Sequence, residues 1–200
     1  RSIQSFEGLE IFINPLNWGS TGWISEENEE RRKIEQGVAA YAEKIRLAEQ
    51  TKTNPDFDIQ IHVGIPNEFQ KKAPYSVCVT AGIETDRVSA EWLMKTHQGI
   101  DKLIVPSEHA AMGFRQTSYE VQNETKQIQT ILSCACPVEV VHYPVKEVEP
   151  DHLDFTTTTS FNFLSMALMG PRKNQENLVK WFVEKFKDNS DVGLILKTSR

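Results

Sequence analysis

The segment 160–200 constrains the fold of this chain more than any other stretch. Residues 161–168 form an almost wholly apolar run, which is typical of a buried strand. Apolar residues then recur at helical spacing over 178–186, and residues 192–196 form a second apolar run that we also expect to be a buried strand. A strand, a helix and a strand in this order predict a βαβ unit with parallel strands and a right-handed crossover.

A basic loop joins the first strand of this unit to its helix. Residues 170–174 read GPRKN, so Arg172 and Lys173 lie where a strand ends and a helix begins. We expect Asn174 to cap the helix, because its side-chain oxygen can accept from a first-turn amide. Helix amides and basic side chains bind phosphate at such positions. The alternative is that both cations are only solvated.

Strands and helices alternate through the rest of the chain. We expect strands at 8–16, 58–63, 75–80, 102–105 and 138–142, a helix from the acidic run 26–30 to Ile45, helices capped by Ser89 and Ser107, and a hairpin over 119–132. This order predicts an α/β fold with a mostly parallel sheet. We divide the chain into a first domain at 1–145, a hinge at 146–159 and the start of a second domain at 160–200.

Composition excludes several classes of function. The net charge of −6 and the pI of about 5.4 argue against a nucleic-acid-binding surface. No apolar run is long enough to span a bilayer. Peripheral membrane contact and self-association into a homo-oligomer need only a local patch, so both stay open.

The cysteines and histidines give no pattern of metal ligands. Cys78 lies in an apolar run and is expected to be a buried thiol. Cys134 and Cys136 are too closely spaced for a structural zinc site, and the histidines show no ligand spacing. An odd count of three without a disulfide framework indicates a reducing, cytoplasmic compartment.

Four stretches, taken in order, resemble the glycosyltransferase group 1 family, whose enzymes have the GT-B fold of two Rossmann-like domains. They are TAGIETDRV (80–88), DKLIVPSEH (101–109), PVEVVHYPV (137–145) and GPRKN (170–174). The resemblance implies that 1–145 is the acceptor-side domain without its first strand, and that 160–200 is the first βαβ unit of the donor-side domain. It also places the catalytic residues, which include an acidic pair near the donor sugar, beyond Arg200. We therefore expect an internal fragment that is inactive alone.

The resemblance implies a retaining enzyme that transfers a sugar from a nucleotide-sugar donor to a hydroxyl of a glycan, lipid or small molecule. Cations and helix amides neutralise the donor diphosphate in this family, so no metal or other cofactor is expected. Lys173 matches the family's phosphate-contacting lysine. The family's arginine five residues earlier is replaced by Leu168, and Arg172 is the candidate to take its place.

The acceptor side offers three further candidates. Glu84 and Asp86 lie in a polar loop after a strand, where carboxylates could hold a hydroxylated acceptor. The alternative is that Asp86 starts a helix and pairs with Arg87. His62 follows another strand and either lines the cleft or is a hydrogen-bonded structural residue. A second hypothesis for the whole chain is a non-catalytic α/β module that binds a partner or a nucleotide.

Overall fold

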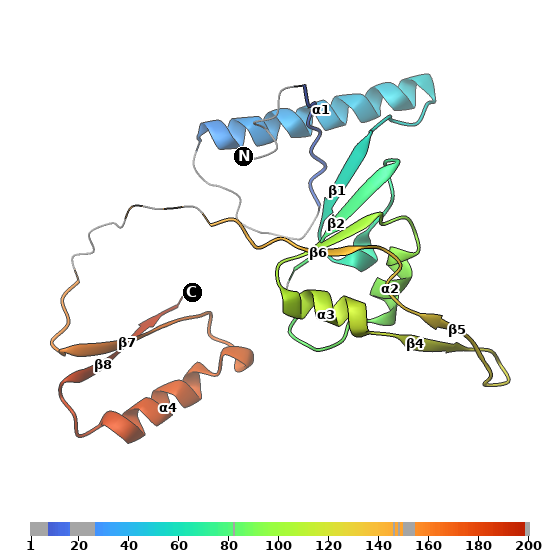
Figure 1. The fold of residues 1–200 in the computed structure, drawn as a ribbon. Coiled ribbons are helices and arrows are strands. Elements are labelled where there is room, and N and C mark those ends of the chain that lie inside the picture. Colours follow the sequence, from blue (N-terminus) through green and yellow to red (C-terminus); the bar gives the residue numbers. More distant parts are fainter. Residues whose placement is uncertain are drawn as a thin grey trace. The chain divides into compact units, whose positions relative to one another are not determined.

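The computed structural model describes residues 8–16, 27–81, 83–145, 147, 149 and 155–198. The chain divides into two compact units, Arg1–Pro144 and Val145–Arg200 (Figure 1). Residues 146, 148 and 150–154 of the expected hinge at 146–159 lie outside the described residues. Each unit is described by itself below.

A parallel sheet forms the centre of the first unit. Its strands are β1 (Ile59–Val63), β2 (Tyr75–Val79), β3 (Lys102–Val105) and β6 (Val138–Val140), in the order β1-β2-β3-β6. His62 pairs with Cys78, Cys78 with Leu103, and Leu103 with Val138, so side chains of all four strands line up on one face. The predicted α/β fold with a parallel sheet is confirmed.

One face of this sheet carries the helices and the core. The elements that connect successive strands of the sheet include η2 (Pro66–Glu68), α2 (Ala90–Thr96) and α3 (Glu108–Gln116). Because the strand order never reverses, right-handed crossovers keep the connecting elements on the same face. Leu93 of α2 and Phe114 of α3 are fully buried against Leu103 and Val105. Burial of each such side chain contributes about 1.5–3 kcal/mol to the free energy of unfolding.

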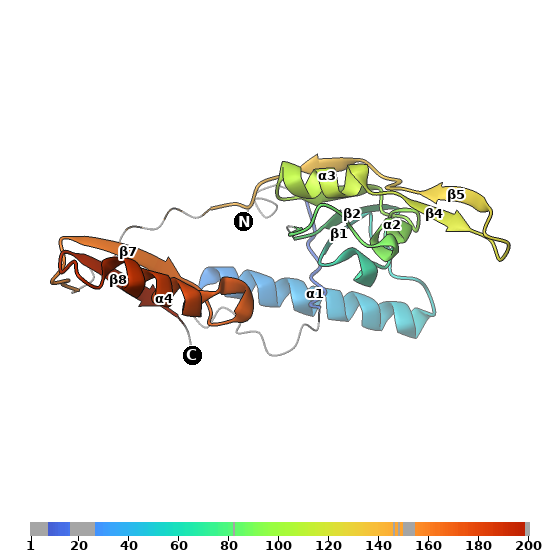
Figure 2. The same cartoon turned by 90° about the horizontal axis from the view of Figure 1, so that it is seen from below.

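Two predicted helix caps and the predicted hairpin of this unit are confirmed. Ser89 Oγ accepts from the Trp92 amide at 3.3 Å, and Ser107 Oγ accepts from the Ala110 amide at 3.2 Å, so both serines are N-caps. The predicted hairpin is confirmed: β4 (Tyr119–Gln122) pairs antiparallel with β5 (Ile128–Leu132). Both strands extend away from the sheet in the two ribbon views (Figures 1 and 2).

The predicted N-terminal helix is α1 (Glu29–Thr51), which Asn28 caps by accepting from the Arg31 amide at 3.0 Å. The expected strand at 8–16 is wrong, because the described segment has no regular secondary structure. The Ile13 amide donates to the Gly37 carbonyl of α1 at 3.0 Å, so the segment bonds to a helix and not to a neighbouring strand.

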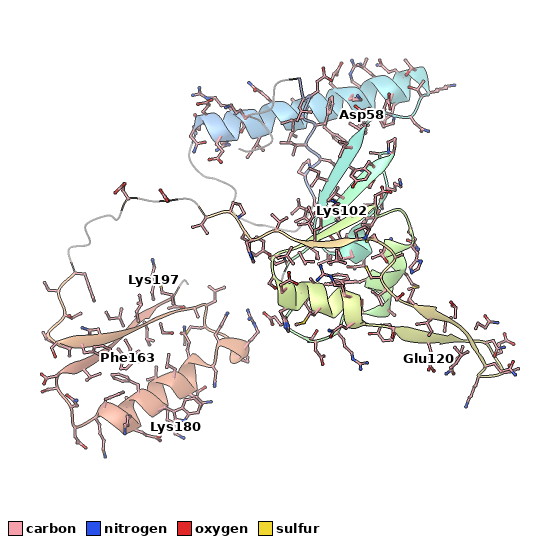
Figure 3. All side chains as sticks on the ribbon, in the orientation of Figure 1. Asp58, Lys102, Glu120, Phe163, Lys180 and Lys197 are labelled. Carbon is pink, nitrogen blue, oxygen red and sulfur yellow. The ribbon has the colours of Figure 1, made fainter. Side chains whose placement is uncertain are left out.

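The second unit is the predicted βαβ unit. It contains β7 (Phe161–Met166), α4 (Gln175–Phe186) and β8 (Val192–Lys197), and the two strands are parallel in full register. Phe163 lies between the sheet and α4 (Figure 3), with its ring 6.2 Å from that of Phe182 and 5.7 Å from that of Phe186.

The expectation that β7 is buried is wrong. Leu164 is 60% exposed and Met166 is 65% exposed. Both side chains alternate with Phe163 and so face away from α4, and no described element of this unit packs over them. The apolar run correctly predicted a strand, but β7 is covered on one face only.

None of the helices in the described ranges combines the length and the hydropathy needed to cross a membrane.

Candidate functional site

The basic loop between β7 and α4 is a compact turn. Pro171–Lys173 form the 3₁₀ helix η3, and the amides of Lys173 and Asn174 both donate to the Gly170 carbonyl, at 3.1 and 3.2 Å. Those two amides are therefore already used within the turn. Arg172 and Lys173 are both exposed.

The amino end of α4 lacks a side-chain cap. Asn174 has a left-handed backbone, with φ 51° and ψ 35°, and its side chain accepts from Asn177 Nδ2 at 2.7 Å, not from a first-turn amide. The prediction that Asn174 caps the helix by its side chain is wrong, because that bond requires the extended backbone of the usual N-cap. The first-turn amides of α4 thus have no capping side chain, and the positive end of the helix dipole stays available to an anion.

Gln175 anchors this turn to the strand. Its side chain is only 4% exposed, and Nε2 donates to the Ala167 carbonyl at 3.1 Å, just after the end of β7. Its Oε1 is buried and has no hydrogen-bond partner among the described residues. Sequence reasoning missed Gln175. The available signal was a polar side chain in the first turn of a helix that directly follows a strand and a tight turn.

The charges at the loop are mixed. Arg172 and Lys173 supply two cations, and the exposed carboxylate of Glu176 lies in the first turn of α4. The net local charge is positive, and the α4 dipole adds to it. This arrangement is suited to an anion, and Glu176 is the carboxylate nearest to it in the sequence.

The carboxyl edge of the sheet in the first unit brings a second set of residues together. Because β1, β2, β3 and β6 are parallel, the segments that follow them share one edge. These segments include residues 81 and 83–87 after β2, Ser107 after β3 and His142 after β6. His142 Nδ1 lies 3.0 Å from the Pro106 carbonyl, which links the ends of β3 and β6.

Glu84 and Asp86 are exposed in the loop after β2. The next helix begins only at Ala90, with Ser89 as its cap, so Asp86 does not start a helix. Asp86 and Arg87 form no ion pair with each other in the part of the chain that the structure describes. Both carboxylates are therefore accessible to solvent at the sheet edge, which is where the acceptor hypothesis needs them.

His62 is buried instead of being exposed at that edge. Its side chain is 8% exposed, and its ring meets Phe69 edge-on at 5.8 Å. Burial lowers the pKa of His62, while a backbone hydrogen bond at Ile65 and the charge of Glu68 oppose that shift. Its Nε2 has no partner among the described residues. This environment is that of a neutral structural histidine packed in the interior.

Thr80 is a polar residue of the same edge that sequence reasoning passed over. Its side chain is 2% exposed, and its buried Oγ1 has no partner among the described residues. Thr80 lies on the face of the sheet that also carries His62 and Cys78, because side chains two residues apart share a face. No pattern in the sequence distinguishes it from an ordinary strand threonine.

The second unit also has an apolar hollow of about 420 Å³ between α4 and the sheet. Phe163, Trp181, Phe182, Phe186 and Leu194 line most of it, and no charged side chain does. A diphosphate would find no counter-charge there, so the hollow is separate in chemistry from the basic loop.

Across the described residues, no group of three or more His, Cys, Asp or Glu side chains is arranged to hold a metal ion. Comparison with known proteins finds no family model, no curated protein and no solved structure that matches the chain. The family resemblance of the four stretches therefore stays a prediction.

Proposed function

We propose that this chain is part of a glycosyltransferase of the GT-B type, which transfers a sugar from a nucleotide-sugar donor to a hydroxyl acceptor. In this proposal the loop 170–174 contacts the donor diphosphate, and the carboxyl edge of the first sheet faces the acceptor.

The observation that carries the proposal is the uncapped amino end of α4 beside Arg172 and Lys173. A diphosphate that leaves a sugar needs its growing negative charge neutralised. Backbone amides at a helix amino end and flanking cations provide that without a metal. The position fits as well, since ligands of parallel α/β units bind beyond the carboxyl ends of the strands.

Two exposed carboxylates support the acceptor half of the proposal. Glu84 and Asp86 lie in a loop beyond the carboxyl end of β2, and carboxylates are good acceptors for sugar hydroxyls. His62 receives no direct role, because its ring is buried against Phe69.

The test of the donor site is calorimetry on the full-length native protein with uridine, guanosine and adenosine diphosphates. We expect one of them to bind, and Lys173→Ala to weaken that binding about tenfold, since one charge-assisted hydrogen bond is lost. Lys180→Ala is the matched control. It removes the same charge from the exposed side of α4 that faces away from the sheet (Figure 3).

Equal affinities of the parent and the Lys173→Ala variant would remove the role assigned to Lys173. Equal weakening in the Lys173→Ala and Lys180→Ala variants would show a general charge effect and would also contradict the assigned site.

A non-catalytic interaction module is the second candidate function. The exposed apolar surface of the second unit favours it, because Leu164, Met166 and Trp181 are each more than half exposed. The two candidates differ in a simple assay. Assayed as the full-length native protein, a glycosyltransferase releases nucleoside diphosphate from a nucleotide sugar when its acceptor is present, whereas a module releases none.

A further inference from the structure

Two cysteines lie together where the hairpin strand β5 leads into the sheet strand β6. Cys134 and Cys136 are both half-buried and pack against the core of the first unit. Their neighbours Ser133, Ala135 and Pro137 are exposed. This alternation shows an extended segment in which both thiols point to the same side.

Hydrogen bonds hold this segment in place. The Cys134 thiol donates to the Cys136 carbonyl oxygen, with Sγ and O 3.4 Å apart. The Ala135 amide donates to Thr96 Oγ1 at 2.9 Å. His97 Nε2 lies 2.9 Å from the Ser133 carbonyl. The end of α2 therefore holds the backbone on both sides of Cys134, whereas neither of these two bonds involves Cys136.

The surroundings make the two thiols unequal. The hydrogen bond from Cys136 lowers the pKa of Cys134, and the hydroxyl of Thr96 and the charge of His97 act in the same direction. The same hydrogen bond, together with burial, raises the pKa of Cys136. Cys78 differs from both, because its side chain is fully buried and this burial raises its pKa to about 12. The thiolate is the reactive form of cysteine, so these shifts favour Cys134 as the attacking thiol, and its half-buried position leaves it more accessible than the fully buried Cys78.

We propose that Cys134 and Cys136 form a reversible redox-modification site that low-molecular-weight disulfides such as glutathione disulfide oxidise. The Cys134 thiolate attacks one sulfur of the disulfide, which gives a mixed disulfide and expels one thiolate. Cys136 then loses its proton to water and attacks Cys134 Sγ, which expels the second thiolate. The protein loses two electrons, and the small disulfide is reduced to two thiols.

The spacing of the two cysteines allows this bond and keeps it reversible. Residues two apart in an extended segment have Cα atoms about 6.6 Å apart, near the upper limit of about 6.8 Å for a disulfide. The segment between β5 and β6 belongs to neither strand and bends at Cys136, so it can shorten locally. A disulfide near its geometric limit is reduced more easily than a relaxed one.

The experiment treats the full chain with glutathione disulfide under native conditions and follows it by mass spectrometry with peptide mapping. We expect the parent to lose two thiols through a Cys134–Cys136 disulfide, while Cys78 stays reduced. Cys136→Ser should instead accumulate one glutathione adduct on Cys134, because the attack by Cys136 is removed. Cys134→Ser should form neither product.

A parent protein that forms no intramolecular disulfide, or a Cys136→Ser variant that carries no adduct on Cys134, would overturn the proposal. Pulsed alkylation of the untreated parent guards against variants that fail to fold. Cys134 should be alkylated at least about tenfold faster than Cys136 and Cys78, following their thiolate content. Equal rates for Cys134 and Cys136 would also overturn it.

Discussion

Gly193 of β8 lies directly against the side chains of Asn162 and Thr159. A Cβ built there would overlap Asn162 Oδ1 and would come within 2.6 Å of Thr159 Oγ1. Thr159 Oγ1 donates to Asn162 Oδ1 at 2.6 Å, and Asn162 Nδ2 donates to Thr157 Oγ1 at 3.1 Å. These polar side chains occupy the space that a methyl group would need.

Gly193→Ala should therefore destabilise the second unit by about 1–3 kcal/mol, the usual cost of overpacking. Amide hydrogen exchange of β7 and β8 measures this directly. Gly170→Ala is the matched control, because a Cβ at Gly170 meets nothing within 4 Å and its φ of −173° is ordinary extended backbone. Equal exchange in the two variants would contradict the close contact.

His62 should make the stability of the first unit depend on pH. Burial lowers its pKa below the usual value of about 6.5. The unfolded state then binds a proton at a higher pH than the folded state does. Above about pH 6.5, His62 is neutral in both states and does not lower the free energy of unfolding. That free energy falls as the pH drops from about 6.5 toward the pKa of His62 in the folded state.

Urea unfolding at pH 7.5 and pH 5.5, read by pulse proteolysis of the first unit, tests this dependence. His62→Gln should reduce the difference in stability between the two pH values. The exposed His109 provides the control, and His109→Gln should leave the difference as it is in the parent. An unchanged difference in the His62 variant would show that His62 does not titrate on unfolding.

At the scale of elements, α3 depends on the cap that Ser107 supplies directly after β3. Ser107→Ala should cost about 1 kcal/mol of stability in the first unit, because the Ala110 amide loses its acceptor. Urea unfolding at pH 7.5 measures the loss. Ser107→Asp keeps an accepting oxygen and should restore most of the stability, whereas a full loss in both variants would point to a steric cause.

Local sequence predicted the elements well where the deciding contact is local. Ser89 and Ser107 cap their helices through a bond to an amide three residues on, and the hairpin turns within its own segment. Expectations failed where a tertiary contact decides. Residues 8–16 bond to α1 and not to a strand. Asn174 is a local failure, because the tight turn 170–174 gives it a left-handed backbone that the residue types do not signal.

The same division holds for the candidate site. The position of Arg172 and Lys173 between β7 and α4 follows from local order, and parallel topology alone brings residues 81 and 83–87 to the sheet edge. The burial of His62 against Phe69 and the anchoring role of Gln175 depend on packing between segments. The order of residue types along the chain does not predict how these segments pack against each other.

At the scale of the whole molecule, the chain consists of two compact units that each have their own parallel strands. We expect residues 1–144, expressed alone, to keep the hydrogen-exchange protection of β1, β2 and β3, since the core around Leu103 lies within that unit. Protection that falls to that of an unfolded chain would show that the first unit needs the second to fold.

We propose that the loop 170–174, together with the first-turn amides of α4, binds the diphosphate of a nucleotide-sugar donor. Hydrogen exchange of the full-length native protein, with and without a nucleoside diphosphate, tests it most directly. The bound diphosphate should slow exchange of the first-turn amides of α4, and Lys173→Ala should require a higher ligand concentration for the same protection. Unchanged exchange over 170–178 at a concentration that saturates binding would contradict the claim.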